Sequence, residues 1–274
     1  LLNVAATMGM ATSRQTLLDG ATVRNIFTGH SGYMGLTATR LVECGFTGEI
    51  DGVGNVYGKV LSDTFDREAV TAGLGADWLL MRNYFKLHPT GRYVHSAIDA
   101  LEDLLGRVPG GRLDLEGIQS IKVRTYMLGA MLAEKNVVSS FGARFSLPFA
   151  LASILYHGRS GLASFAEPAA ANPKIRALAQ LVDLREDPQH TARYPDETPC
   201  DLAITLADGT VLEGHCAVMK GEPANPHKPQ DLQAKFFDLG TPVWGEKTTK
   251  RLFADLRNLE SIPDFGAFAD QFAL

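Results

Sequence analysis

The spacing of apolar residues changes twice along this chain, and that change limits the folds open to it. Residues 23–41 place Val23, Ile26 and Met34 on one face at helical spacing. Residues 118–126 and 202–218 instead alternate apolar and polar side chains, which is typical of strands. Helical patterns return at 229–238, 246–257 and 263–272. This order predicts an α+β fold in which the chain leaves a helical domain and later returns to it.

Glycines and turn sequences predict where individual helices and strands begin and end. Gly45 is expected to end the first long helix, and Gly29, Gly32 and Gly35 within it predict close packing against another helix. Asp208-Gly209 predicts a tight hairpin turn between the two best strands. We also expect a short strand at 84–86 and helices at 92–105, 145–156 and 174–181. The predicted domains are a partial helical domain at 1–83, an α+β lid at 84–222 and a return to the helical domain at 223–274.

Composition excludes several classes of protein. The 274 residues are 45% hydrophobic and 21% charged, with a net charge of −5 and no basic block, which argues against a nucleic-acid or anionic-membrane surface. No apolar run reaches the roughly 18 residues that cross a bilayer. Three widely spaced cysteines make a disulfide framework improbable and favour a cytoplasmic location. Since the chain opens at Leu1 in apolar sequence, we expect it to be a piece of something longer.

Most familiar motifs are missing. The glycines from Gly52 to Gly58 have the spacing G-x-G-x-x-x-G without a preceding strand, which does not match a dinucleotide fingerprint. The seven histidines include no pair at i, i+4, so the sequence gives metal binding little support.

One segment concentrates groups that can do chemistry. Residues 84–95 (YFKLHPTGRYVH) bring Lys86, His88, Arg92 and His95 into a strand end and the start of a helix. A helix N-terminus beside cationic side chains attracts carboxylates, and histidine or a partly desolvated lysine can move protons. The residues alone predict a small anion-binding site, with a solvated basic patch as the plainer alternative.

Five segments in this order resemble the MmgE/PrpD family, which includes 2-methylcitrate dehydratase, cis-aconitate decarboxylase and iminodisuccinate epimerase. The segments are residues 20–25 (GATVRN), 72–75 (AGLG), 84–95, 144–148 (RFSLP) and 220–226 (KGEPANP), and the resemblance runs over essentially the whole chain. The resemblance implies a helical domain interrupted by a smaller α+β lid. It also implies lyase or isomerase chemistry on a small polycarboxylate, without a nucleotide and generally without a metal or other cofactor.

The motif match implies roles for individual residues. Lys86 and His95 are the expected catalytic residues, Arg92 is the expected carboxylate clamp, and Tyr93 and His88 are further substrate-binding candidates. His30 is a weaker one, because a histidine on a helix face is more often a core residue.

Two hypotheses therefore stand. In the first, the chain is a carbon–oxygen lyase similar to 2-methylcitrate dehydratase, acting with a complementary chain that supplies the family's N-terminal helices, or as a homodimer. In the second, it is a half-length paralogue that lost catalysis and serves as an interaction subunit. The second hypothesis is favoured by residues 14–19. Many members carry Lys-Pro-x-His there, whereas this chain has Gln15 and Leu18 at the lysine and histidine positions.

Overall fold

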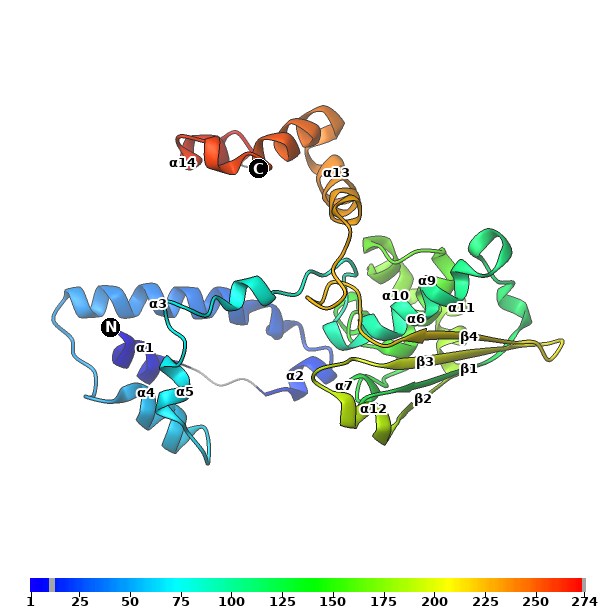
Figure 1. The fold of residues 1–274 in the computed structure, drawn as a ribbon, viewed down its shortest axis with the longest axis horizontal. Coiled ribbons are helices and arrows are strands. Elements are labelled where there is room, and N and C mark those ends of the chain that lie inside the picture. The colour runs from blue at the N-terminus through cyan, green and yellow to red at the C-terminus, as the bar shows by residue number, and fades with distance from the viewer. Residues whose placement is uncertain (10–12, 273–274) are drawn as a thin grey trace. The chain divides into compact units, whose positions relative to one another are not determined.

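The computed structural model describes residues 1–9 and 13–272. It forms two compact units, one of residues 1–83 and 88–219 and the other of residues 84–87 and 220–274. The first unit holds four strands and most of the helices, which confirms the mixture of helices and sheet (Figure 1). The grouping of 1–83 with 223–274 in one helical domain, interrupted by a lid, stays a prediction.

A four-stranded sheet is the centre of the first unit, in the order β2-β1-β3-β4. β1 runs parallel to β2 and antiparallel to β3, and β3 and β4 form a hairpin. The strand bounds are β1 Ile118–Thr125, β2 Val182–Glu186, β3 Cys200–Leu206 and β4 Val211–Cys216. The predicted strand at 118–126 and the predicted hairpin are both confirmed, with Gly209 at φ +85° in the turn.

Helices cover one face of this sheet. Ile121 and Val123 of β1 and Ile204 of β3 are buried beneath them, while the intervening residues face outward. α6 packs against β3 and β4, and α9 packs between α6 and α11 (Figure 1). The helices from α6 to α12 are α6 His95–Gly106, α7 Met127–Ala130, α8 Ser140–Ala143, α9 Leu147–His157, α10 Glu167–Ala171, α11 Pro173–Gln180 and α12 Pro188–Arg193.

α9 is the core helix of the unit. Nine of its residues, from Leu147 to Leu155, are buried, as expected for a helix that is apolar all round. The Ser146 hydroxyl caps it by accepting a hydrogen bond from the Phe149 N–H at 3.0 Å. Pro148 lies in the first turn, where a missing N–H costs nothing, as the sequence predicts.

The N-terminal part is helical but mostly exposed. Its helices are α1 Leu2–Met8, α2 Gln15–Leu18, α3 Phe27–Glu43, α4 Gly52–Asn55 and α5 Arg67–Thr71. The end of α3 just before Gly45 is confirmed. The close packing expected at Gly29, Gly32 and Gly35 is not found among the described residues, since a Cβ added at any of them meets nothing within 4 Å.

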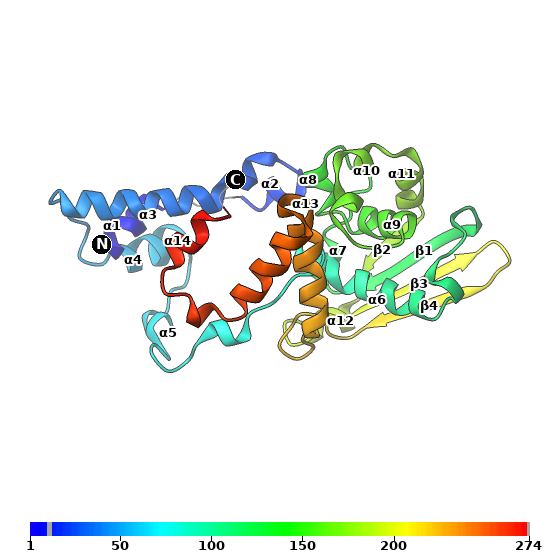
Figure 2. The ribbon, with the colours of Figure 1, turned by 90° about the horizontal axis from the view of Figure 1, so that it is seen from above.

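The second unit is built from helices that fold back on each other. α13 (Pro229–Leu256) bends at Gly245, so the helices predicted at 229–238 and 246–257 are its two arms (Figure 2). The Phe253 ring of the second arm lies 5.2 Å from Phe236 and 5.5 Å from Phe237 of the first. α14 (Phe265–Asp270) leads to Phe272, whose ring lies 6.4 Å from Trp244.

The expected strand at 84–86 is wrong. This segment has no regular structure, and its backbone groups pair with other residues of the second unit, to which it belongs. The Phe85 N–H donates to the Gly221 carbonyl at 3.1 Å, and His227 Nε2 lies 2.8 Å from the Phe85 carbonyl.

Candidate active site

The predicted site segment, residues 84–95, ends in the first residues of a helix. Residues 92–94 form a 3₁₀ turn that continues directly into α6, so helical structure starts at Arg92, as the sequence predicts. His95 is the first residue of α6, and its side chain is buried with 1% of its surface exposed. The chemistry-bearing residues from His88 to His95 therefore belong to the first unit, whereas Lys86 belongs to the second.

His88 and His95 lie against each other. Their ring centroids are 4.9 Å apart and the ring planes meet at 70°. His88 Nε2 is 3.6 Å from the Asp99 Oδ1, and Asp99 stands one helical turn after His95 on α6. His88 and Asp99 are both more than nine-tenths buried. The loop before α6 and the first turns of α6 thus form one buried polar group.

An aromatic cluster stands beside this group. Tyr93 packs edge-on against Tyr126 with ring centroids 6.3 Å apart, and Tyr126 stacks on Tyr194 at 5.1 Å. Burial raises the pKa of Tyr126 well above its usual range, while a contact with Ser96 and the charge of Arg92 act in the opposite direction. Tyr126 is therefore a neutral phenol at physiological pH, and it lies close enough to Arg92 for the two groups to interact electrostatically.

One backbone hydrogen bond and one close approach to a side chain fix the position of Gly91, just before α6. The Gly91 N–H donates to the Arg144 carbonyl at 2.7 Å. A Cβ on Gly91 would lie 2.9 Å from the Phe145 ring, so the position requires glycine unless that ring moves. The segment 144–148 thereby contacts the segment 84–95, and Gly20 in turn lies against Gly142 just upstream, where an added Cβ would stand 3.2 Å from the Gly142 Cα.

Contacts with residues of the second unit fix the backbone of Lys86, which belongs to that unit. Its carbonyl accepts a hydrogen bond from the Lys235 ammonium, and burial lowers the pKa of Lys235. Gly221 has φ +98°, and a Cβ there would lie 2.2 Å from the Phe85 carbonyl oxygen. Only glycine allows this approach, so the segments 84–95 and 220–226 meet at the backbone next to Lys86.

His30 lies away from this arrangement in the chain. It is a half-buried residue of α3, a helix that packs mainly against α1 and the 3₁₀ turn at Thr22–Ile26. The structure gives His30 no part in the His88–His95 contact.

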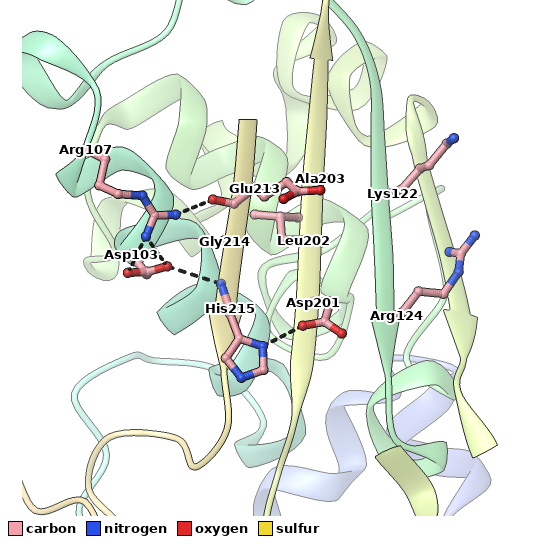
Figure 3. Close-up of a pocket in the computed structure, with 10 residues that line it drawn as sticks. All are labelled: Asp103, Arg107, Lys122, Arg124, Asp201, Leu202, Ala203, Glu213, Gly214 and His215. Atoms are coloured by element: carbon pink, nitrogen blue, oxygen red, sulfur yellow. Dashed lines mark hydrogen bonds and ion pairs between the residues drawn. The ribbon is translucent and has the colours of Figure 1, made fainter. Parts of the chain in front are cut away.

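A separate hollow lies on the outer face of the sheet and contains none of the predicted site residues (Figure 3). Arg107, just after α6, pairs with Asp103 of that helix, and the Asp201 carboxylate lies 2.5 Å from His215 Nδ1. Arg124, also on this face, pairs with Asp183 at 2.9 Å. Since these charges are largely neutralised in pairs, we interpret the hollow as a solvated face of the sheet.

Comparison with known proteins agrees with this segment order. The model of the MmgE/PrpD C-terminal domain matches residues 88–259, more than half of the chain, and the match begins at His88. The chain belongs to the MmgE/PrpD family. The resemblance to this family is therefore confirmed, although the segments 20–25 and 72–75 lie outside the matched residues.

Curated relatives in the MmgE/PrpD family are lyases. Human cis-aconitate decarboxylase is 26% identical over 127 residues, which cover 46% of this chain and 26% of that enzyme. The mouse enzyme of the same name is 26% identical over 126 residues. The 2-methylcitrate dehydratase of Cupriavidus necator is 29% identical over 132 residues, or 46% of this chain and 27% of that enzyme. The alignments thus span about a quarter of each relative's length.

The sequence alone does not identify three residues that contact the predicted site residues or the aromatic cluster beside them. Asp99 reads as an ordinary polar position of an amphipathic helix, and only its spacing from His95 hints at a shared face. Tyr126 sits at the end of a strand pattern and Lys235 in a helix pattern, with no local signal for either. Tyr126 and Lys235 depend on contacts between segments far apart in the sequence, whereas Asp99 contacts His88 in the loop just before α6.

Proposed function

We propose that this chain carries the site of a lyase or isomerase that acts on a small polycarboxylate by proton transfer beside a carboxylate. The observation that carries the proposal is the buried contact of His88 and His95 at the start of α6, at the point where the family match begins. Dehydration, as in 2-methylcitrate dehydratase, is the reaction class we favour, which makes the enzyme a carbon–oxygen lyase.

Each predicted residue has a chemical role in this proposal. Lys86 and His95 exchange the proton, because amine and imidazole groups transfer protons near neutral pH. Arg92 clamps a substrate carboxylate, since a guanidinium binds carboxylates through two parallel hydrogen bonds. His88 and Tyr93 complete the binding surface, with His30 as a weaker candidate. The reaction needs no cofactor in this scheme.

Turnover of 2-methylcitrate and of cis-aconitate tests the proposal. We expect the chain, alone or with a complementary family chain, to dehydrate or decarboxylate one of them, and Lys86→Ala to remove that activity. Lys174→Ala, an exposed lysine of α11, is the matched control. Absence of turnover in every combination would contradict the enzyme proposal.

A second candidate function is that of a non-catalytic interaction subunit. It is favoured by Gln15, which lies where many relatives have a lysine and whose side-chain amide donates to Asp19 at 2.6 Å. A subunit of this kind would raise the activity of a full-length relative without turning over substrate itself. Coupled assays with and without this chain separate the two functions.

The partner is part of the same proposal. Ile26, Tyr33 and Leu36 of the region around α3 are 58%, 67% and 68% exposed, which is unusual for large apolar side chains. We infer that this face is covered by a complementary family chain or, without one, by a second copy. We place the complex in the cytoplasm because the three cysteines are free and widely spaced. Among the described residues, no helix has the length and apolar character needed to cross a bilayer.

A further inference from the structure

Three successive polar groups of the backbone around Lys86 are hydrogen-bonded to residues much later in the chain. The Phe85 N–H donates to the Gly221 carbonyl at 3.1 Å, and His227 Nε2 lies 2.8 Å from the Phe85 carbonyl. A carbonyl oxygen only accepts, so in this bond the His227 Nε2 carries the hydrogen. The next carbonyl, that of Lys86, accepts a hydrogen bond from the Lys235 ammonium. All of these residues belong to the second unit.

Two of these partners come from one closed turn. The Gly221 N–H donates to the Asn225 carbonyl at 2.8 Å, and Asn225 forms an isolated β-bridge with Glu222. Pro226, immediately before His227, fixes its own φ and restricts the backbone that leads to the imidazole. The turn therefore presents the Gly221 carbonyl and the His227 ring from a backbone with little freedom.

Lys235 approaches from a different element, α13. The helix begins at Pro229, and the Asp231 carboxylate caps it by accepting a hydrogen bond from the Lys228 N–H at 3.0 Å. Lys235 is half-buried, and this burial lowers its pKa. Partial desolvation of an ammonium is unfavourable unless an acceptor compensates, and the Lys86 carbonyl is such an acceptor.

These bonds fix both peptide units that flank the Lys86 Cα. The Phe85 carbonyl belongs to the peptide before it, and the Lys86 carbonyl belongs to the peptide after it. Because each peptide unit is planar, holding both of them restricts the φ and ψ of Lys86. The direction in which the Lys86 side chain leaves the backbone is restricted in turn. Lys235 supplies the hold on the second of the two peptides.

We propose that Lys235 is a positioning residue, which holds the Lys86 carbonyl and thereby sets where the Lys86 ammonium meets a bound polycarboxylate. The proposal rests on the polycarboxylate site proposed above, and it gives Lys235 no contact with the substrate. Misplacement of a functional group by about 1 Å can cost on the order of 100-fold, so a bond to the backbone of such a group affects the ligand indirectly.

Calorimetric titration with cis-aconitate and 2-methylcitrate, with the partner chain where one is required, tests the effect on the ligand. Lys235→Met keeps the length of the side chain but removes the donor, and we expect affinity to fall at least about 10-fold. Lys235→Arg should restore affinity to near the parent value, because a guanidinium also donates to a carbonyl. Lys247→Met, which changes an exposed lysine on the second arm of α13, is the matched control.

A double variant separates positioning from direct binding or general stabilisation. Since Lys235 acts through Lys86, Lys235→Met should cause no further loss of affinity when Lys86→Ala is already present. Additive losses in the double variant would overturn the proposal. Circular dichroism checks that each variant is folded, and Lys235→Arg provides a folded comparison that keeps the charge.

Hydrogen exchange of the Phe85 amide measures the hold on the backbone without any ligand. We expect exchange to accelerate at least about 10-fold in Lys235→Met and to stay as in the parent in Lys247→Met. Unchanged exchange would overturn the proposal, and so would faster exchange with unchanged affinity, because the hold would then not affect the ligand. If the parent binds neither compound, the proposed function fails, and the exchange rates alone decide whether Lys235 holds the Lys86 backbone.

Discussion

The backbone N–H of Gly91 donates a hydrogen bond to the carbonyl of Arg144 at 2.7 Å. This bond joins the loop before α6 to the loop before α9, the two helices that cover the sheet from above in Figure 1. Because His95 begins α6 only four residues later, the position of its ring depends on this contact.

Gly91→Ala tests that dependence. The backbone has φ −59°, so alanine brings no backbone strain, but its Cβ would lie 2.9 Å from the Phe145 ring. We expect this overpacking to lower the free energy of unfolding by about 1–3 kcal/mol in urea titrations. Gly106→Ala in α6 is the control, since an added Cβ there meets nothing within 4 Å. Equal stability of the two variants would show that the Gly91 contact is loose.

Gly221→Ala tests how the segment around Lys86 is held. Both Gly221 and Gly209 have positive φ, at +98° and +85°, so alanine strains both positions. Only at Gly221 does the new Cβ approach the Phe85 carbonyl oxygen at 2.2 Å. We therefore expect hydrogen exchange of the Phe85 amide to accelerate at least about 10-fold in Gly221→Ala, which corresponds to about 1.4 kcal/mol of local stability. In Gly209→Ala that amide should exchange as in the parent.

The ion pairs of Asp183 give a pH-dependent prediction. Hydrogen bonds from Arg185 and then Arg124 lower the pKa of Asp183 below its ordinary value of 3.8. A lowered pKa in the folded state stabilises the fold above the unfolded pKa, and that stability disappears as the pH falls through the folded value. Since Asp183 is 38% exposed, solvent screening limits the effect of Asp183→Asn at pH 7 to under about 1 kcal/mol.

Unfolding titrations at several pH values measure this effect. The difference between the parent and Asp183→Asn should be largest near neutrality and vanish well below pH 3.8. Asp196→Asn, which changes an exposed carboxylate on the loop before β3, is the control variant. A constant gap between parent and Asp183→Asn at all pH values would mean that the carboxylate charge plays no part.

The exposed face of α3 predicts association in solution. Burying a large apolar side chain contributes about 1.5–3 kcal/mol, so Tyr33 and Leu36 together favour a partner. We expect light scattering at micromolar concentrations to report a mass above the 29.6 kDa of one chain, and Leu36→Asp to reduce it. Val138→Asp changes an apolar residue outside α3 that is even more exposed, at 83%, and should leave the mass unchanged. A stable monomer at every concentration would contradict the proposed partner.

The sequence predicts the elements of this fold better than their contacts. The periodicity of 92–105 and 118–126 and the Asp208-Gly209 turn act locally, so they locate α6, β1 and the β3–β4 hairpin correctly. β2 at Val182–Glu186 is missed, because two apolar residues in five give a weak pattern and its pairing with β1 comes from a distant segment.

In the candidate site, too, the sequence predicts neighbours in the chain but not the contacts that form on folding. The sequence groups His88, Arg92 and His95 because they are neighbours in the chain. Asp99 lies beside His88 only once the loop before α6 folds against that helix, and Tyr126 lies beside Ser96 only once the end of β1 meets α6.

Calorimetric binding of cis-aconitate and 2-methylcitrate tests the central claim, that the region from Lys86 to His95 binds polycarboxylates. Losing a hydrogen bond to a bound charge costs about 1.5–3 kcal/mol, which is roughly a 10- to 150-fold loss of affinity. We predict that the chain, with its partner where one is required, binds at least one of these compounds and that Lys86→Ala and Arg92→Gln each lose that much affinity. Lys174→Ala should bind as the parent does. Unchanged binding in both Lys86→Ala and Arg92→Gln would contradict the account and leave this segment as a basic surface.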